Sequence, residues 1–419
     1  MKITDIKTHL VMPLERLAWL FVEVETDEGI TGIGECTNYS ANPALIFGME
    51  SLIKPLVIGE DPWKIEKIWH RIFSTYSSSN GRGYISNLIS GLDIALWDIK
   101  GKSLGVPIYE LLGGPVRERV PLYTHVQDQT PHQAGSIKDG KTEFRTPTIE
   151  EMIDAAKDAK AAGYEAIKTD PFPSDDLEGD PTWTDGTITF EKVGIYESLN
   201  NKKIRQSVEW MEALREAVGP DFEILIDAHG RFDVPSAIKA ANALEHINLV
   251  WFEEPCHAAN HESLRQVREN TGVPLCVGER HFTRWDYTPL FHNRLVDYVM
   301  PDVAWCGGIS EFRRISSLAE TFYIPVSPHD ALGPVAIGAS FQLCMNITNL
   351  YRQECIHTWF SEFEKIITPM FDIQNGCIIP NGNPGIGFDL IPEALEEYKI
   401  KPEDNRSKPM WFTSSKDKI

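Results

Sequence analysis

A repeating unit dominates the sequence from about residue 120 onward: a short β-branched apolar run, one polar residue that ends it, and an amphipathic stretch. Six of these polar residues follow one another at intervals of 26, 26, 23, 27 and 25 residues. They are Asp227, Glu253, Glu279, Asp302, His329 and Glu354. Upstream, Lys168 and His125 end runs of the same form, which makes eight units. A strand of about five residues, a helix of about 12 and two short loops fit this spacing.

The segments between the apolar runs have helical periodicity. Residues 234–246 and 309–322 both carry apolar side chains at i, i+3 and i+4 spacing. The runs themselves are too apolar for strands with one exposed face, as in a parallel sheet covered by helices. Eight such units predict an α/β fold, a (β/α)8 TIM-type barrel. A doubly wound parallel sheet is the alternative.

The first part of the chain follows a different pattern. Residues 4–13 and 19–35 are typical of antiparallel strands with a glycine-containing turn, and 44–58 and 86–105 of helices. Strands followed by helices predict a separate α+β domain. Residues 381–398 have more turn and strand character than a barrel helix. The predicted organisation is an α+β domain over 1–120, the barrel over 121–370, and a C-terminal segment over 371–419 that packs back on the first domain.

Two insertions interrupt the repeat, at 127–147 and 171–203. The first is polar and contains glycine, and the second is rich in Pro, Asp and Gly. Each follows a strand at the barrel face where active sites form, so both are candidate lids. A surface excursion without a function is the alternative.

Composition argues against several classes of function. The 419 residues carry a formal net charge of −21 and no run of more than two Lys or Arg, which disfavours a broad nucleic-acid-binding surface. No apolar stretch approaches the roughly 20 residues of a membrane span, and the N-terminus lacks the apolar core of a signal peptide. The seven cysteines form no CxxC pair, as expected for reduced thiols. We therefore expect a cytoplasmic protein without nucleic-acid or membrane partners.

The strands of a parallel barrel all end on one face, so the polar residues at their ends should converge. Asp227, Glu253 and Glu279 are carboxylates on consecutive strands. Like charges this close raise each other's pKa unless a cation lies between them, and oxygen ligands favour Mg²⁺. These three are the predicted metal ligands, although any one alone could be a salt bridge or helix N-cap. Side chains alternate along a strand, and the 26-residue register selects Glu253 over Glu254.

A histidine and an aspartate end the neighbouring seventh and sixth strands. An Asp hydrogen-bonded to one imidazole nitrogen raises the basicity of the other. His329 is therefore a candidate general base with Asp302 as its partner, and a structural buried histidine is the alternative. By strand alternation, His229 should lie on the same side as Asp227, two residues before it.

These residues suit abstraction of a proton from the carbon next to a carboxylate. The product is an enediolate with two negative oxygens, whose charge Mg²⁺ would offset. Lys168 and Glu354, from flanking strands, are expected to neutralise and hydrogen-bond the other carboxylate oxygen. His229 then remains to protonate a leaving hydroxyl on the β-carbon. One base and one acid with separate roles describe a β-elimination of water.

Several motifs resemble those of a known family. They are IDAHGR, WFEEP, VGER, MPDVAWCGGIS and SPHDALGP. Together they resemble the enolase superfamily, and within it the mandelate racemase subgroup, which a His–Asp pair marks. Residues 91–114 resemble the end of that family's N-terminal capping domain. The resemblance covers nearly the whole chain and implies an enolase-like modified barrel, a Mg²⁺ cofactor and a homo-oligomer.

Further motifs narrow the resemblance. IDAHGRF, GERHFTRWDY, GGISEFRRI, HDALGPVAIGAS and RQE resemble acid-sugar dehydratases of the D-galactonate dehydratase type. Such enzymes remove water from an aldonic acid to give a 2-keto-3-deoxy acid. The resemblance implies the three carboxylates as metal ligands, His329 as base with Asp302, and His229 as general acid. It also implies Glu354 and Lys168 as binders of the substrate carboxylate.

The second strand departs from the racemase pattern. Racemising members carry Lys-x-Lys, whereas this chain has Lys168-Thr169-Asp170, so racemisation is not expected. Galactonate dehydratase has an amide where this chain has Asp170, which we predict to contact substrate. Family precedent links a His base to the R configuration at C2 that galactonate, gluconate and xylonate share. Mannonate dehydratases are similar too, but Met300 stands where their arginine is expected.

We therefore expect a Mg²⁺-dependent hydro-lyase that dehydrates a small sugar acid such as D-galactonate or D-gluconate. A cycloisomerase or epimerase using the same enediolate is one alternative, and a catalytically silent metabolite-binding regulator is another. Substrate specificity is expected in loops of the first domain at 12–19 and 76–84. There, Trp19 and Arg82 are predicted to contact substrate.

Overall fold

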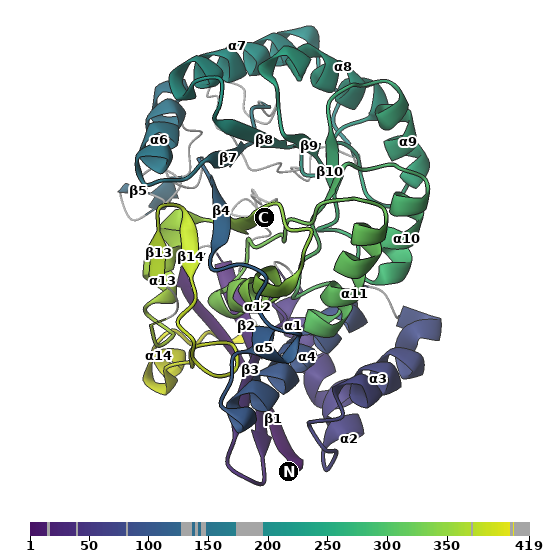
Figure 1. Cartoon of the computed structure of the whole chain (residues 1–419), viewed down its shortest axis with the longest axis vertical. Coiled ribbons are helices and arrows are strands. Elements are labelled where there is room, and N and C mark those ends of the chain that lie inside the picture. Colours follow the sequence, from purple (N-terminus) through teal and green to yellow (C-terminus); the bar gives the residue numbers. More distant parts are fainter. Residues whose placement is uncertain are drawn as a thin grey trace.

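The computed structural model (Figure 1) describes residues 1–14, 17–38, 41–80, 83–126, 136–138, 141–143, 148–172, 196–369, 372–402 and 405. An antiparallel sheet with helices forms one end of the molecule, and parallel strands inside a ring of helices form the other. Among the helices of the described ranges, none is long and apolar enough to cross a membrane. All seven cysteines are free thiols, as expected.

The N-terminal part contains three antiparallel strands followed by helices, as the sequence predicts. Its elements are β1 (Ile3–Leu14), β2 (Leu17–Thr26), β3 (Thr31–Glu35), α1 (Asn42–Gly48), a π-helical segment (Met49–Ile53), α2 (Lys54–Val57), α3 (Ile65–Asn80), α4 (Tyr84–Leu104) and α5 (Ile108–Leu111). The contact of β3 with α4 requires glycine, because a Cβ on Gly34 would lie 1.9 Å from the carbonyl oxygen of Gly91. Most of the predicted loop at 12–19 is strand, since β1 continues to Leu14 and β2 begins at Leu17.

The barrel strands follow one another in chain order, and β12 pairs with β4 to close the ring. They are β4 (Val120–His125), β7 (Ala166–Thr169), β8 (Glu223–Asp227), β9 (Trp251–Glu253), β10 (Leu275–Val277), β11 (Tyr298–Val299) and β12 (Gln353–Cys355). The helices are α6 (Ile149–Ala161), α7 (Asn201–Val218), α8 (Val234–Leu244) with a 3₁₀ turn at Glu245–Ile247, α9 (His261–Glu269), α10 (Arg284–His292), α11 (Gly308–Thr321) and α12 (Pro334–Asn346). Since α8 and α11 occupy the segments with predicted helical periodicity and the strands are parallel, the α/β barrel prediction is confirmed.

The seventh strand is much shorter than the sequence predicts. It is reduced to Val326, which forms a parallel bridge to Val299. Pro325 and Pro328 lie on either side of this residue, and neither has an N–H to donate, which limits the ladder. His329 lies beyond this bridge, where its N–H donates to the carbonyl of Pro301 at 3.1 Å and its side chain contacts Asp302 and Glu279.

The C-terminal segment contacts both parts of the molecule. It follows a 3₁₀ turn (His357–Trp359) and α13 (Phe360–Phe363), and its own elements are β13 (Asp372–Gln374), β14 (Cys377–Ile379) and α14 (Pro392–Glu397). The N–H of Ile400 donates to the carbonyl of Leu10 at 3.0 Å, so this end of the segment lies against β1. By contrast, β14 pairs antiparallel with the start of β4, which the sequence did not predict. The domain bounds stay a prediction.

The two predicted insertions lie largely outside the described residues. Within 127–147, the structure describes one pair of short antiparallel strands, β5 (Ser136–Lys138) and β6 (Lys141–Glu143). Within 171–203, residues 173–195 are outside the described part. Their role as lids stays a prediction.

Buried polar contacts join the N-terminal helices to the barrel. The indole Nε1 of Trp69 donates to the carbonyl of Gly307 at 2.8 Å. Asp93 of α4 accepts hydrogen bonds from the N–H and the hydroxyl of Ser310 in α11, at 2.9 and 2.6 Å. These contacts fix the N-terminal part beside the loop that follows β11.

A buried carboxylate makes a further link between the two parts. Glu35 of β3 accepts hydrogen bonds from the N–H groups of Gly333 and Ala336, at the start of α12, and from the hydroxyl of Thr37. Burial raises the pKa of Glu35 from 4.5 to about 7, although these hydrogen bonds lower it. The folded protein therefore keeps a proton that the unfolded chain releases at lower pH. The stabilising contribution of this proton is complete below pH 4.5 and is lost as the pH rises through 7.

We expect the free energy of unfolding of the wild type, relative to that of Glu35→Gln, to fall by about 3 kcal/mol between pH 4.5 and 7. Glutamine does not titrate, so the difference isolates the carboxyl group of Glu35. Urea unfolding at several pH values measures it. A difference that rises with pH, or that does not change, would contradict a buried and protonated Glu35.

Candidate active site

Three carboxylates meet at the mouth of the barrel. Asp227 and Glu253 are the last residues of β8 and β9 and are register partners, and Glu279 lies two residues after β10. Each offers an oxygen within 4.8 Å of those of the other two. Their exposed fractions are 3, 0 and 4%. The structure thus brings the three predicted ligands together. Glu254 is directed elsewhere and accepts the N–H of Gly278 at 2.9 Å.

The chemistry of this cluster fits a hard divalent cation. Burial raises the pKa of Glu253 well above its ordinary range, and the neighbouring Asp227 raises it further. Lys168 offsets part of the negative charge, since its Nζ lies 2.7 Å from Glu253 and 3.5 Å from Asp227. A buried donor set made entirely of carboxylate oxygens suits Mg²⁺, with water or substrate supplying the remaining ligands.

Glu354 of β12 lies beside two groups from neighbouring strands. Its Oε1 is 2.5 Å from Nζ of Lys168 and 2.6 Å from Nε2 of His125. Burial would raise the pKa of Glu354, but Lys168 and His125 lower it well below its ordinary range. Lys168 and Glu354 therefore come together as predicted. No role was predicted for His125, although it ends the first strand of the repeat just as the other site residues end theirs.

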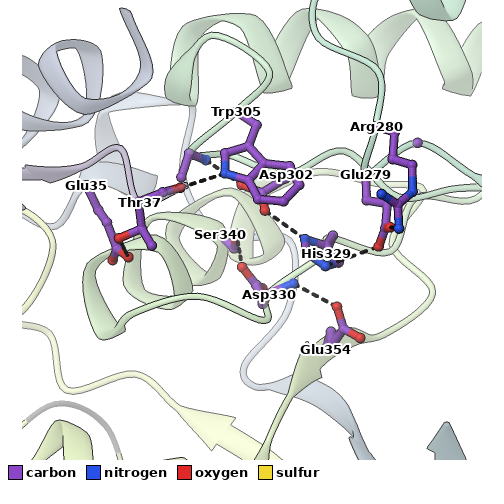
Figure 2. Close-up of polar contacts among 12 residues, drawn as sticks. Glu35, Thr37, Glu279, Arg280, Asp302, Trp305, His329, Asp330, Ser340 and Glu354 are labelled. Carbon is purple, nitrogen blue, oxygen red and sulfur yellow. Dashed lines mark hydrogen bonds and ion pairs between the residues drawn. The ribbon is translucent and has the colours of Figure 1, made fainter. Parts of the chain in front are cut away.

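His329 lies between two carboxylates (Figure 2). Its Nδ1 is 2.7 Å from Oδ2 of Asp302, and its Nε2 is 3.2 Å from Oε2 of Glu279. Burial lowers the pKa of His329, but Glu279 and Asp302 raise it to about 9. The ring of Trp305 packs against the imidazole at 5.4 Å between centroids. The predicted base and its partner are thus in contact, and Nε2 is directed toward the carboxylate cluster.

His229 reaches the cluster from a turn rather than a strand. The strand β8 ends at Asp227, and His229 and Gly230 have φ of 55° and 70°, in the left-handed region that side chains disfavour. The N–H of His229 donates to Oδ1 of Asp227 at 2.7 Å, and its Nε2 lies 3.2 Å from Oδ2. The predicted proximity to Asp227 is confirmed. Strand alternation does not explain this proximity, because β8 ends at Asp227 and the turn that follows directs the ring.

The predicted contact of Asp170 with substrate stays a prediction, and the structure shows which protein groups hold this carboxylate. Its Oδ1 accepts hydrogen bonds from Nη2 of Arg231 at 2.8 Å and from the N–H of Phe172 at 3.0 Å. Its Oδ2 lies 2.8 Å from Nη1 of Arg231 and 3.1 Å from Nδ1 of His229. Only 2% of the residue is exposed. Both oxygens are therefore engaged by groups of the protein itself.

Neither predicted substrate contact from the N-terminal loops gains support. Trp19 is fully buried, with its ring centroid 5.3 Å from that of Phe363 and 6.5 Å from that of Phe21. These contacts place Trp19 in the hydrophobic core. It lies within β2, which begins at Leu17, and not in a loop. Arg82 lies outside the described residues, so its role stays a prediction.

The sequence alone assigned no role to Asp330. Asp330 accepts a hydrogen bond from Ser340 at 2.7 Å, and its N–H donates to Oε2 of Glu354 at 2.8 Å (Figure 2). It also accepts a hydrogen bond from Gln353 at 2.9 Å. It therefore holds Glu354 in place. Adjacency in the chain was the available signal, since Asp330 directly follows the predicted base.

Family models match most of the chain. Residues 151–394 match the model described as enolase C-terminal domain-like. Residues 11–113 match the N-terminal domain of mandelate racemase and muconate lactonizing enzyme. The first match contains the carboxylate cluster and both histidines.

Individual proteins are similar over nearly the full length. D-xylonate dehydratase of Haloferax volcanii is 31% identical over 405 residues, covering 96% of this chain and 90% of that protein. D-galactonate dehydratase of Pectobacterium atrosepticum is 30% identical and covers 98% and 97%. The solved structure of an enolase superfamily member from Salmonella Typhimurium has a TM-score of 0.83 at 30% identity, covering 94% and 98%. The chain belongs to the enolase superfamily, in its mandelate racemase and muconate lactonizing enzyme subgroup.

Proposed function

We propose that this chain is a Mg²⁺-dependent acid-sugar dehydratase, a hydro-lyase that converts an aldonic acid such as D-galactonate or D-gluconate into a 2-keto-3-deoxy acid. One observation carries the proposal: three buried carboxylates within 4.8 Å of one another adjoin a His–Asp pair, with Nε2 of His329 3.2 Å from Glu279. The names of the relatives, D-xylonate and D-galactonate dehydratase, support the substrate class.

The first step is removal of the proton at C2. Nε2 of His329 takes this proton, and the electron pair of the C–H bond moves toward the substrate carboxylate to give an enediolate. Asp302 holds Nδ1 and stabilises the imidazolium that forms. Asp227, Glu253 and Glu279 would hold Mg²⁺, which when bound offsets negative charge on the carboxylate oxygens.

The substrate carboxylate would lie beside Lys168 and Glu354. Both are buried, and their side chains are 2.5 Å apart. Lys168 carries the positive charge that this carboxylate requires, since Glu253 and Glu354 raise the pKa of Lys168 well above its ordinary range despite burial. Exclusion of water strengthens this interaction in the transition state.

The second step removes the hydroxyl at C3. Nε2 of His229 gives a proton to this hydroxyl, the C3–O bond breaks, and the electron pair of the enediolate forms the C2–C3 double bond. Water leaves, and the resulting enol tautomerises to the 2-keto-3-deoxy acid. His229 and His329 lie at different edges of the carboxylate cluster, beside Asp227 and Glu279 respectively. This separation lets one act as acid and the other as base.

A panel of aldonic acids should separate this function from its alternatives. With Mg²⁺, we expect at least one of D-galactonate, D-gluconate and D-xylonate to yield a 2-keto product that reacts with semicarbazide. Addition of EDTA should stop the reaction. Deuterium from D₂O at C2 of recovered substrate, without any keto product, would instead indicate an epimerase or cycloisomerase. Tight binding without either reaction would indicate a regulatory protein.

A further inference from the structure

The general acid of the proposed mechanism is held between two carboxylates, and only one of them belongs to the metal cluster. Nδ1 of His229 lies 3.1 Å from Oδ2 of Asp170, and Nε2 lies 3.2 Å from Oδ2 of Asp227. The two nitrogens therefore face in different directions, Nδ1 toward Asp170, which directly follows β7, and Nε2 toward Asp227 at the end of β8. The left-handed backbone at His229, with φ of 55°, is the kind of strain that persists at functional sites.

Asp170 is itself clamped by an arginine. Nη1 and Nη2 of Arg231 lie 2.8 Å from Oδ2 and Oδ1 of Asp170, the two-point geometry of a strong Arg–carboxylate pair. Nη2 of Arg231 also donates to the carbonyl of Phe172 at 3.1 Å. The N–H of Phe172 in turn donates to Oδ1 of Asp170. The side chains are 2% and 4% exposed. The carboxylate thus cannot rotate away from His229 without breaking buried, charge-assisted hydrogen bonds.

We propose that Asp170, fixed by Arg231, is a positioning residue that keeps a proton on Nδ1 of His229 and so directs the transferable proton on Nε2 at the leaving hydroxyl. This rests on the proposed dehydration. When Nε2 gives its proton to the 3-hydroxyl and the C3–O bond breaks, the Nδ1–H bond to Asp170 remains intact. Arg231 holds both oxygens of Asp170 in place, so Oδ2 stays within hydrogen-bond distance of Nδ1 and fixes the orientation of the imidazole ring.

A purely structural role for this pair makes a different prediction. Asp170 follows β7 and Arg231 follows β8, so their ion pair could simply tie two loops together. Loss of such a tie would disturb the site as a whole, and both chemical steps would slow together. A positioning role acts through His229, so it affects the loss of the hydroxyl and spares the removal of the C2 proton by His329.

The test compares these two steps in Asp170→Asn. In D₂O with Mg²⁺ and the aldonic acid turned over fastest in the screen, semicarbazide measures dehydration and proton NMR measures deuterium at C2 of recovered substrate. We expect the ratio of C2 exchange to dehydration to rise by about 10- to 100-fold, below the roughly 10²–10⁴-fold contribution of a whole general acid. Arg231→Lys, which keeps the charge but loses the two-point geometry, should raise the ratio less.

A matched control breaks a similar ion pair on the outside of the barrel. Arg268 binds Asp297 through two hydrogen bonds of 2.6 and 2.9 Å, and both side chains are about a third exposed. Asp297 also accepts the N–H of Leu275 at the start of β10, opposite the end that leads to Glu279, so Asp297→Asn removes the same kind of contact away from the carboxylate cluster. Its ratio should equal that of the wild type. If Asp170→Asn lowers both rates and leaves the ratio unchanged, the pair is only structural and the proposal is wrong.

A second measurement needs no turnover, so it separates this proposal from the dehydration itself. In protein labelled with ¹⁵N-histidine, His229→Asn identifies the signals of His229. We expect the wild-type Nδ1 to have the shift of a protonated nitrogen, and Asp170→Asn to change it. Identical Nδ1 shifts in the wild type and Asp170→Asn would overturn the positioning role, whatever the screen of acids finds.

Discussion

Replacement of His329 by asparagine should lower the rate of dehydration by about 10²–10⁴-fold, while the protein stays folded. The imidazole is buried, its Nδ1 lies 2.7 Å from Asp302, and its Nε2, 3.2 Å from Glu279, is the nitrogen directed at the carboxylate cluster. Asparagine keeps a polar group near Asp302 but cannot accept a proton from carbon. Steady-state kinetics measure the loss, and circular dichroism with thermal unfolding shows whether the fold is intact.

The His329→Asn and His229→Asn variants should each lose a different step of the reaction. His329→Asn should lose deuterium exchange at C2 together with dehydration, because the proton is never removed. His229→Asn should keep the first step and lose the second, so exchange at C2 should continue. Near wild-type dehydration in His329→Asn would remove His329 as the base, and exchange that survives in this variant would assign the C2 proton to another group.

Substitution in the carboxylate cluster should abolish both metal binding and turnover. We expect Glu253→Gln to weaken Mg²⁺ binding by more than the roughly 10–100-fold that loss of an outer-shell partner costs. Glu253 is fully buried, and burial and Asp227 both raise its pKa, so the neutral amide should leave the metal-free protein at least as stable as the wild type. Calorimetric titration with Mg²⁺ measures binding, and thermal unfolding in EDTA measures stability.

Glu254→Gln is the matched control for this variant. Glu254 is the adjacent residue and equally buried, but its Oε1 accepts the N–H of Gly278 and it is not part of the cluster. It should keep Mg²⁺ binding close to that of the wild type. Equal loss in Glu253→Gln and Glu254→Gln would mean that the binding depends on the charge of this region rather than on the predicted ligands.

The spacing of polar residues was sufficient to predict the barrel and its three acidic residues, for a physical reason. Parallel strands of similar length, each followed by one helix, return to the same face at a nearly constant interval. Asp227 and Glu253 end their strands, so the repeat placed them directly. Glu279 and His329 lie two and three residues beyond the last paired residue of their strands, Val277 and Val326. They still fit the repeat, because its intervals vary by a few residues.

Other features depend on contacts between distant segments, which a repeat cannot reveal. His229 is directed by a left-handed turn, and Asp170 by an arginine 61 residues further along the chain. Strand alternation does not explain the position of His229, because β8 ends at Asp227, and the repeat gave no sign of the contact between Asp170 and Arg231. Trp19 was expected in a loop at the barrel mouth. In the structure it lies in β2 and is fully buried. The shortness of the seventh strand was readable from Pro325 and Pro328, but the repeat alone did not show it.

The most direct test of the account is a crystal structure with Mn²⁺ in place of Mg²⁺, with anomalous diffraction used to locate the ion. We predict one anomalous peak between Asp227, Glu253 and Glu279, within about 2.0–2.3 Å of an oxygen from each residue. The same crystals of Glu253→Gln should lack this peak. Saturating Mn²⁺ that leaves the space between the three carboxylates without a peak would contradict the metal-dependent mechanism.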